Sequence, residues 1–173
     1  MKTEAFVSVQ EYLKTSYDPD CDYVDGEVQE RNVGERDHSE VQGELFFFFR
    51  QRQKQWKTFA FVEQRVQISA RRFRVPDVCV YVGAKPSEQV FRTPPLICIE
   101  VLSPKDRMER IQQRIDDYLN FGVQYVWVFN PRSRRAWTYS KDGSREIFDG
   151  VLKTESPAFE VPLAEVFAAL DAK

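Results

Sequence analysis

Two carboxylates in the sequence lie inside stretches that are otherwise apolar, and together they could hold a divalent cation. Glu100 lies within LICIEVLSP, residues 96–104, and Asp77 lies within RVPDVCVYV, residues 74–82. An unpaired charge inside a buried strand is costly, so such an acid is expected either to be neutralised or to take part in chemistry. Carboxylate oxygens, backbone carbonyls and water are the ligands that Mg²⁺ prefers. If the two stretches are neighbouring strands, Asp77 and Glu100 predict a site for Mg²⁺ or Mn²⁺.

The connection between the two stretches favours such a pairing. Residues 83–95 contain three prolines and no helical periodicity, so strands over residues 77–82 and 96–102 are predicted to be antiparallel neighbours. Their carboxylates, Asp77 and Glu100, could then converge at one end of the sheet. Two nearby carboxylates repel each other, which would raise the pKa of one of them, and a divalent cation removes that repulsion.

A helix and a further strand follow Glu100 and indicate the fold class. Apolar residues at helical spacing predict a helix from Pro104 to the glycine at 122, and YVWVF, residues 125–129, predicts a strand. A strand, a helix and a strand in succession form a right-handed crossover between parallel strands. The chain is therefore predicted to be α/β, with one mixed central sheet flanked by helices in a single domain of residues 1–173.

The remaining elements are predicted from local signals. Ser8 and Glu11 form a capping box that opens a short helix, and Asp25-Gly26 between apolar residues predicts a two-residue hairpin turn. Further predicted elements are a helix over residues 37–54, strands over 59–69 and 136–140, and a helix over 161–170.

Composition and charge exclude several classes of protein. The net charge of −2 gives no general attraction to nucleic acid, and the three cysteines form no CxxC pair that would indicate a zinc site. His38 is the only histidine, which excludes a Ser-His-Asp triad and a metal site built from several histidines. No apolar stretch is long enough to span a bilayer, and the N-terminus lacks the apolar core of a signal peptide. The predicted location is the cytoplasm, with no membrane partner.

Basic side chains are concentrated in one part of the chain. Residues 50–74 contain eight of them against Glu63 alone, whereas residues 1–30 are rich in acids. Such a run is either a solvated face or a surface that contacts phosphate groups, and the sequence favours neither interpretation.

The motifs around the two acids resemble those of one protein family. RVPDVCVY is followed by PPLICIEVLSP and then by a helix that leads to YLNFGVQYVWVFNP, while YVDGEV and His38 precede them. This arrangement, over roughly residues 5–140, resembles the Uma-two family of restriction endonuclease-like proteins in the PD-(D/E)xK nuclease superfamily. The resemblance implies a restriction-endonuclease-like fold and metal-dependent hydrolysis of phosphodiester bonds in nucleic acid, with DNA as the expected substrate.

The resemblance also implies roles for individual residues. Asp77, Glu100 and the carbonyl oxygen of Val101 would hold Mg²⁺ or Mn²⁺. The superfamily usually has a lysine two residues after the glutamate, where this chain has Leu102; Uma-two-like proteins carry the lysine on the following helix, where this chain has Arg114. An arginine can stabilise negative charge and bind a phosphate through two hydrogen bonds, but it cannot be deprotonated to act as a base.

Four more residues are candidates, Glu27 and His38 by the resemblance and the other two by their position. Glu27 would be a further ligand or a water-orienting group, unless it is only a polar residue of the hairpin. His38 would contact a phosphate or a carboxylate, unless it forms hydrogen bonds at the start of its helix. Lys105 and Arg107, near the start of the helix after Glu100, are candidates for contacts with phosphate.

Three interpretations of the function remain open from the sequence. The first is a Mg²⁺-dependent endonuclease. The second is a catalytically inactive, nuclease-derived module for DNA binding or assembly, which the missing lysine and the isoelectric point of about 5.6 favour. The third is a protein-interaction domain alone, with the aromatic run 46–49 as its contact surface. Because cleavage of two strands commonly uses two sites related by a two-fold axis, a homodimer is predicted.

Overall fold

The computed structural model describes residues 6–32 and 34–171 and contains a six-stranded central sheet. The strands lie in the order β10-β9-β8-β7-β6-β3. Their bounds are β3 Thr58–Val62, β6 Val78–Val82, β7 Ile97–Val101, β8 Tyr125–Asn130, β9 Arg135–Ser140 and β10 Gly143–Glu146. β7 and β8 are parallel and the other neighbours are antiparallel, so the predicted mixed sheet is confirmed.

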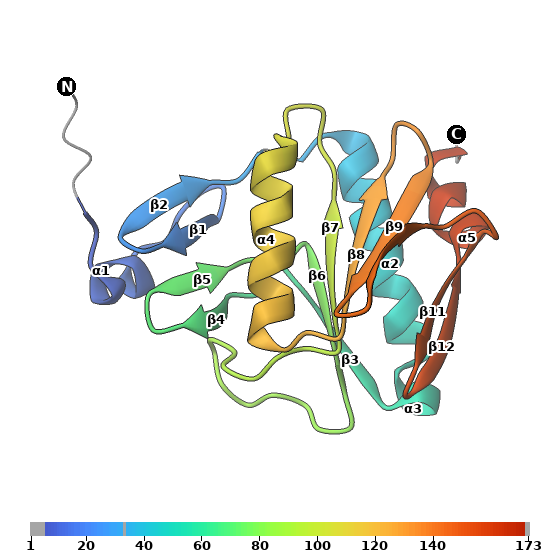
Figure 1. Ribbon diagram of the computed structural model, residues 1–173, viewed down its shortest axis with the longest axis horizontal. Coiled ribbons are helices and arrows are strands. Elements are labelled where there is room, and N and C mark those ends of the chain that lie inside the picture. The colour runs from blue at the N-terminus through green and yellow to red at the C-terminus, as the bar shows by residue number, and fades with distance from the viewer. Residues whose placement is uncertain (1–5, 33, 172–173) are drawn as a thin grey trace.

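Helices cover both faces of this sheet (Figure 1). In the view, α4, Met108–Phe121, lies in front of the sheet and α2, Arg36–Gln51, lies behind it. Alternate side chains of β7 enter the two cores, with Ile97 and Ile99 on the α2 side and Cys98 on the α4 side. The predicted α/β class with flanking helices is confirmed.

The connection between β7 and β8 is the crossover that contains α4. The helix begins at Met108, later than the predicted start at Pro104. The residues before it form a turn in which Asp106 accepts a hydrogen bond from the N–H of Ser103 at 2.6 Å. The helix ends, as predicted, at Gly122, whose φ of 111° suits a residue without a Cβ atom.

A second sheet of four strands lies beside the central one, in the order β2-β1-β5-β4. Its strands are β1 Cys21–Val24, β2 Glu27–Glu30, β4 Val66–Ser69 and β5 Arg72–Arg74. The predicted hairpin turn between β1 and β2 is confirmed, because Asp25 and Gly26 both have positive φ, 52° and 111°. α1, Val9–Lys14, begins after Ser8, whose hydroxyl accepts a hydrogen bond from the N–H of Glu11 at 3.1 Å.

Two stretches that were each predicted as one strand are divided between the two sheets. Residues 59–69 form most of β3 and all of β4, and the chain turns between them at Glu63, where φ is 48°. Residues 74–83 are divided between the end of β5 and β6. Asp77 therefore lies just before β6, at the point where the chain passes from the small sheet to the central one.

The C-terminal part of the chain packs on the α2 side of the sheet. Its elements are β11 Val151–Glu155, β12 Ala158–Pro162, α5 Leu163–Ala168 and the 3₁₀ helix Ala169–Asp171, and the short helix α3, Gln53–Trp56, follows α2. The helix predicted over residues 161–170 begins later because Val161 and Pro162 pair with β11. No helix among the described residues is long and apolar enough to cross a membrane.

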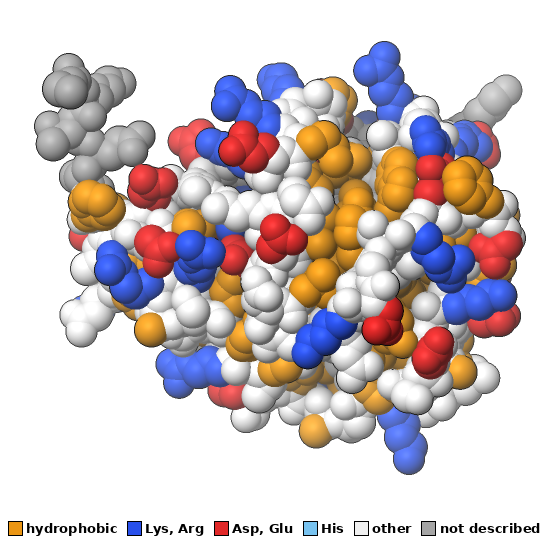
Figure 2. All heavy atoms as spheres, viewed as in Figure 1, with side chains coloured by type: hydrophobic (Ala, Val, Ile, Leu, Met, Phe, Trp, Pro, Cys, Tyr) orange, Lys and Arg blue, Asp and Glu red, His pale blue; other side chains and the backbone are white. Residues whose placement is uncertain are grey.

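Arginines of the basic run pair with acids of the acidic N-terminal run. The pairs are Arg65–Asp20 at 3.0 Å, Arg72–Asp25 at 2.7 Å and Arg74–Asp22 at 2.9 Å. These arginines therefore form neither a solvated basic face nor a surface for phosphate, because partners distant in sequence neutralise them. Figure 2 shows the result on one face of the molecule, where basic and acidic side chains are interspersed.

Candidate active site

The carboxylates of Asp77 and Glu100 come together where β6 begins and β7 ends. The antiparallel register sets Val78 opposite Ile99, so Asp77, one residue earlier, stands opposite Glu100. Both residues are only 1% exposed. Two buried carboxylates at this separation need partners, and protein donors surround each of them.

Three elements supply the donors to Asp77. Nη2 of Arg31, which follows β2, forms an ion pair with Oδ1 of Asp77. The N–H of Val101 donates to Oδ2 at 2.7 Å, and Nε2 of His38, on α2, lies 3.4 Å from the same oxygen. Burial raises the pKa of Asp77, but Arg31, His38 and the Val101 N–H outweigh it, so this pKa lies below its ordinary value. Burial lowers the pKa of His38, but the hydrogen bond to Asp77 outweighs it, so that pKa is raised.

Two residues of α4 hold Glu100. The hydroxyl of Tyr118 donates to Oε1, and Nη1 of Arg114 donates to Oε2, both at 2.7 Å. Burial raises the pKa of Glu100, Arg114 lowers it, and the charge on Asp77 raises it further, so this pKa lies above its ordinary value. The two acids are therefore unequal: as pH falls, Glu100 takes up a proton before Asp77 does.

Arg114 connects this pair of acids to a third buried carboxylate, that of Asp22. Its Nε donates to Oδ2 of Asp22 at 3.0 Å, and Nη1 of Arg74 donates to the same oxygen at 2.9 Å. Burial raises the pKa of Asp22, yet Arg114 and Arg74 hold it below its ordinary value. Arg114, at the helix position where the resemblance implies a lysine, is thus in contact with Glu100, but it shares its charge between two carboxylates.

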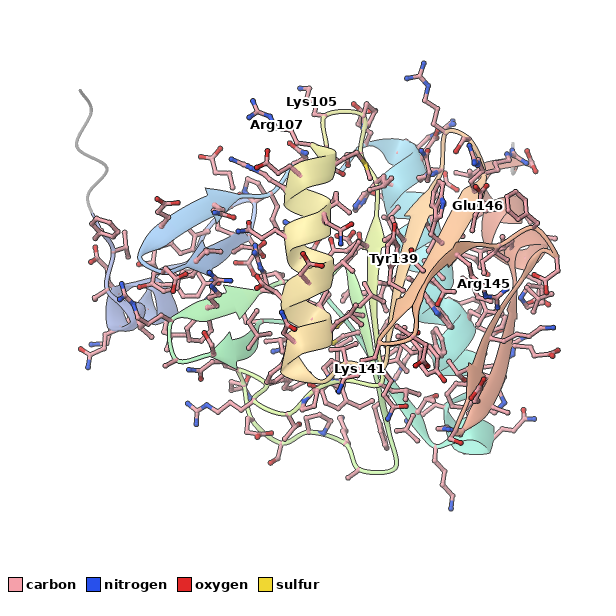
Figure 3. All side chains as sticks on the ribbon, in the orientation of Figure 1. Lys105, Arg107, Tyr139, Lys141, Arg145 and Glu146 are labelled. Carbon is pink, nitrogen blue, oxygen red and sulfur yellow. The ribbon has the colours of Figure 1, made fainter. Side chains whose placement is uncertain are left out.

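The other candidate residues lie farther from the acids. Glu27 is exposed at the start of β2, beside the hairpin turn, whereas Arg31 follows the other end of that strand. No residue that the structure describes forms a hydrogen bond with the Glu27 side chain. Lys105 and Arg107 are exposed and project from the N-terminal end of α4 (Figure 3). The structure therefore brings Arg114 and His38 to the acids, but not Glu27.

Residues that contact the two acids line two cavities, although neither acid itself lines them, and Asp106 lines both. One has a volume of about 530 Å³ and is lined by His38 of α2 and by the turn after β7. The other has a volume of about 220 Å³ and is lined by Arg31 and Arg114. A larger cavity of about 830 Å³ lies around Tyr125 at the opposite end of β8, away from both acids.

The donor chemistry of the acid pair fits a divalent cation, but the present partners compete for the same oxygens. Carboxylates from neighbouring strands are the hard ligands that Mg²⁺ binds. All four of their oxygens already accept from protein donors. Over residues 6–32 and 34–171, no group of three or more His, Cys, Asp or Glu side chains could hold a metal ion. A cation bound by Asp77 would therefore have to displace Arg31.

Sequence comparison identifies the family. The profile of the Uma2 family, described as "Putative restriction endonuclease", matches residues 9–165. The chain belongs to the Uma2 family. Its fold is also similar to the crystal structure titled as a putative nuclease belonging to DUF820 from Anabaena variabilis ATCC 29413. The two chains are 22% identical, the match covers 95% of this chain and 99% of the other, and the TM-score is 0.83. No curated protein matches the chain.

Membership of Uma2 confirms the family resemblance that the motifs indicate, and the similar crystal structure shows that the fold is shared with a protein described as a nuclease. Family and fold therefore favour a restriction endonuclease-like nuclease. Nucleases of this kind generally use divalent metal ions.

Three residues that hold this Uma2 site together were not among the predicted ones: Arg31, Asp22 and Tyr118. Asp22 could have been found, because it lies in the buried strand CDYV in the same way that Glu100 lies in ICIEV. Arg31 gives no local signal, since it follows the hairpin in an unremarkable polar segment and reaches Asp77 only through tertiary structure.

Proposed function

We propose that this Uma2 chain is a nuclease that hydrolyses phosphodiester bonds in DNA, with Asp77 and Glu100 as ligands of Mg²⁺ or Mn²⁺. The observation that carries the proposal is the pair of buried carboxylates on neighbouring strands, bordered by two cavities, in a chain with the motifs of this family. The carbonyl oxygen of Val101 is the third protein ligand in this proposal.

In the proposed mechanism, the residues of the chain orient and stabilise and do not remove a proton. Lewis-acid polarisation of a phosphoryl oxygen is the chemistry that a divalent ion supplies when bound. Arg114 stabilises the negative charge that develops on the phosphate, because a guanidinium stays protonated throughout. Tyr118 orients Glu100 and His38 orients Asp77 through the contacts described above. A role for Glu27 as a ligand or water-orienting group stays a prediction.

Cleavage assays test this proposal directly. Purified protein is incubated with DNA in the presence of Mg²⁺, Mn²⁺ or a chelator, and Asp77→Ala is compared with Asp142→Ala, an exposed acid at the opposite end of the sheet. Cleavage is expected only with a divalent ion, and Asp77→Ala should lower it by about 10²- to 10³-fold, the typical loss for one electrostatic group of an active site. Equal cleavage by Asp77→Ala would assign the activity to a contaminant and end the proposal.

The second candidate function is a catalytically inactive module that binds DNA or supports an assembly. The ion pairs favour it, because Arg31 and Arg114 neutralise the two acids without a metal ion. Arg114→Lys separates the two candidates, since it restores the lysine of the family at a position in contact with Glu100. A gain in cleavage supports the enzyme. DNA binding that weakens with salt, without cleavage in either version, supports the module.

A homodimer and a cytoplasmic location complete the proposal. Phe48 and Phe49 are core residues, whereas Phe47 is 51% exposed, so Phe47 is the member of the aromatic run available for a dimer contact. Gel filtration of the wild type and of Phe47→Ser tests this part. A dimer that becomes a monomer in the variant is expected, and a wild-type monomer contradicts the dimer. Phe48→Ser is unsuitable because it would disturb the core.

A further inference from the structure

The smaller of the two cavities beside the acid pair is strongly basic. We call it the basic pocket. Its lining includes five basic side chains against two acidic ones. The basic ones are Arg31, Lys105, Arg107, Arg110 and Arg114. Since the whole chain has a net charge of −2, this concentration of positive charge is a local feature and not a consequence of composition.

The five basic residues divide into two groups. Arg31 and Arg114 pair with buried carboxylates at the back of the pocket. Lys105, Arg107 and Arg110 are exposed, and none of them forms a side-chain hydrogen bond or an ion pair with a residue that the structure describes. Figure 2 shows basic side chains gathered in this region, over the N-terminal end of α4. Their charge is therefore available to a ligand from outside the chain.

Arg31 provides a second observation that points to a ligand. Its side chain is only 10% exposed and lines the pocket. Its Nε is buried and finds no acceptor among the residues that the structure describes. Buried arginine donors normally have a partner, and an anionic acceptor gives the strongest hydrogen bond. An oxyanion bound against Arg31 is an acceptor of this kind.

The start of α4 adds to the attraction for an anion. The helix runs over 14 residues, and its N-cap residue, Arg107, forms no side-chain hydrogen bond to the free N–H groups of the first turn. These groups and the helix dipole favour a negatively charged group at this end. One acid of the pocket, Asp106, is already engaged, because Asn32 and the N–H of Ser103 both donate to its carboxylate at 2.6 Å.

We propose that the basic pocket binds a phosphate group of a nucleic-acid strand and holds that strand beside Asp77 and Glu100. Several arginine forks and one ammonium around a volume of about 220 Å³ suit the tetrahedral oxygens of a single phosphate. The identification of the phosphate as part of a nucleic acid rests on the proposed function. The phosphate is either an internal diester or the monoester at a strand end, and the experiment distinguishes the two.

The test measures binding of short fluorescent DNA strands, with and without a 5′-phosphate, by anisotropy at several salt concentrations and without divalent ions. The pocket variant is Arg107→Ala/Arg110→Ala, because both residues are exposed and without side-chain partners in the described part of the chain. The matched control is Arg145→Ala, an exposed arginine that lines the larger, distant cavity. Thermal unfolding of each variant shows that the fold is retained.

The pocket variant is expected to bind more weakly, with a slope of log K against log salt that is less steep by about 1 to 2, as the loss of one or two phosphate contacts predicts. Arg145→Ala should change neither quantity. If the loss occurs only with 5′-phosphorylated strands, the pocket takes the monoester; if it occurs with both, it takes a diester. An unchanged slope and affinity in the pocket variant overturns the proposal.

The result of this binding test does not depend on whether the protein cleaves DNA. Asp77→Asn should strongly lower cleavage if the proposed function holds, yet it leaves Lys105, Arg107 and Arg110 in place. DNA binding that depends on the pocket, in a chain that never cleaves, would support the phosphate site and contradict the nuclease. If the pocket variant cleaves and binds DNA as the wild type does, the result supports the nuclease and contradicts the phosphate site.

Discussion

Two clusters of buried ion pairs share Arg114, and they differ in how completely their donors are used. The enclosed cluster is formed by Arg74 with Asp22, Asp117 and Gln29. Arg74 is 1% exposed, and each of its three side-chain nitrogens donates to one of these partners. In the acid-pair site, formed by Asp77, Glu100, the arginines that face them and His38, two buried polar atoms have no partner in the described structure: Nε of Arg31 and Nδ1 of His38.

The same contrast holds for the surroundings of the two clusters. The enclosed cluster connects the small sheet to α4. Residues of the acid-pair site line two cavities, and each unpartnered atom belongs to one of these residues. Ion pairs alone therefore do not distinguish the two clusters. The unpartnered polar atoms do, because only the acid-pair site has unused hydrogen-bonding capacity in residues that line a cavity.

The largest effect on stability is expected for Arg74→Met. The substitution removes the arginine that pairs with both buried carboxylates, Asp22 and Asp117, and breaking a buried pair by removing one member typically costs about 3–5 kcal/mol. Urea denaturation measures the loss. The matched control is Arg72→Met on the same strand, whose side chain is 34% exposed, so its loss should stay within about 1 kcal/mol. Equal losses of stability in the two variants would contradict the expectation that an enclosed arginine contributes more than an exposed one.

A somewhat smaller and pH-dependent effect is expected for Asp22→Asn. The pKa of Asp22 is lowered in the folded chain, because Arg114 and Arg74 outweigh burial, so the unfolded chain binds the proton first as pH falls. The stability that Asp22 contributes is therefore present above the ordinary aspartate pKa of about 3.9, and it is lost as pH falls through the lowered value. We expect a difference of about 2–3 kcal/mol between wild type and variant at pH 7.

Urea midpoints measured between pH 7 and pH 3.5 follow this difference, which should stay constant above about pH 5 and shrink below that. Asp25→Asn is the control, because its pair with Arg72 is half exposed and should contribute at most about 1 kcal/mol. A difference for Asp22→Asn that grows on acidification contradicts the lowered pKa.

The sequence predicts the central part of this fold well because its signals there are local. Glycine at 122 ends α4, Asp25-Gly26 makes the hairpin, and the apolar run of β7 together with α4 and β8 forms the crossover. The boundary between the two sheets was missed, because a single residue with positive φ, Glu63, divides what looks like one strand. The edge strand β10 was missed because its residues are largely exposed. β11 and β12, which form a separate two-stranded sheet, were missed although buried and exposed residues alternate along them.

The candidate site was predictable in its acids but not in their neutralisation. A carboxylate within an apolar run identifies Glu100, and the same signal applies to Asp22. The expectation of a cation followed from the repulsion between Asp77 and Glu100 and from the preference of Mg²⁺ for carboxylate oxygens. Arg31, which follows a hairpin distant in sequence, neutralises Asp77 as a cation would. No local pattern relates its position to Asp77. The choice between arginine and metal is thus a property of tertiary structure.

Arg31→Met tests that choice, and its effect on stability is expected to be smaller than those of Arg74→Met and Asp22→Asn. Asp77 keeps its contacts with His38 and the Val101 N–H, and the site borders solvent-accessible cavities, so the loss should be about 1–2 kcal/mol.

Because Arg31 competes for Asp77, its removal should strengthen Mn²⁺ binding. At a hundred times the dissociation constant, an ion that binds only the folded chain adds about 2.7 kcal/mol, so Mn²⁺ should raise the thermal midpoint more in the variant than in the wild type. Arg65→Met, which removes a partly buried pair with Asp20 away from the acids, controls for destabilisation alone and should leave the response to Mn²⁺ unchanged. Equal responses in all three proteins would mean that Arg31 does not hold the place of a cation, and that the acid-pair site is, like the enclosed cluster, structural.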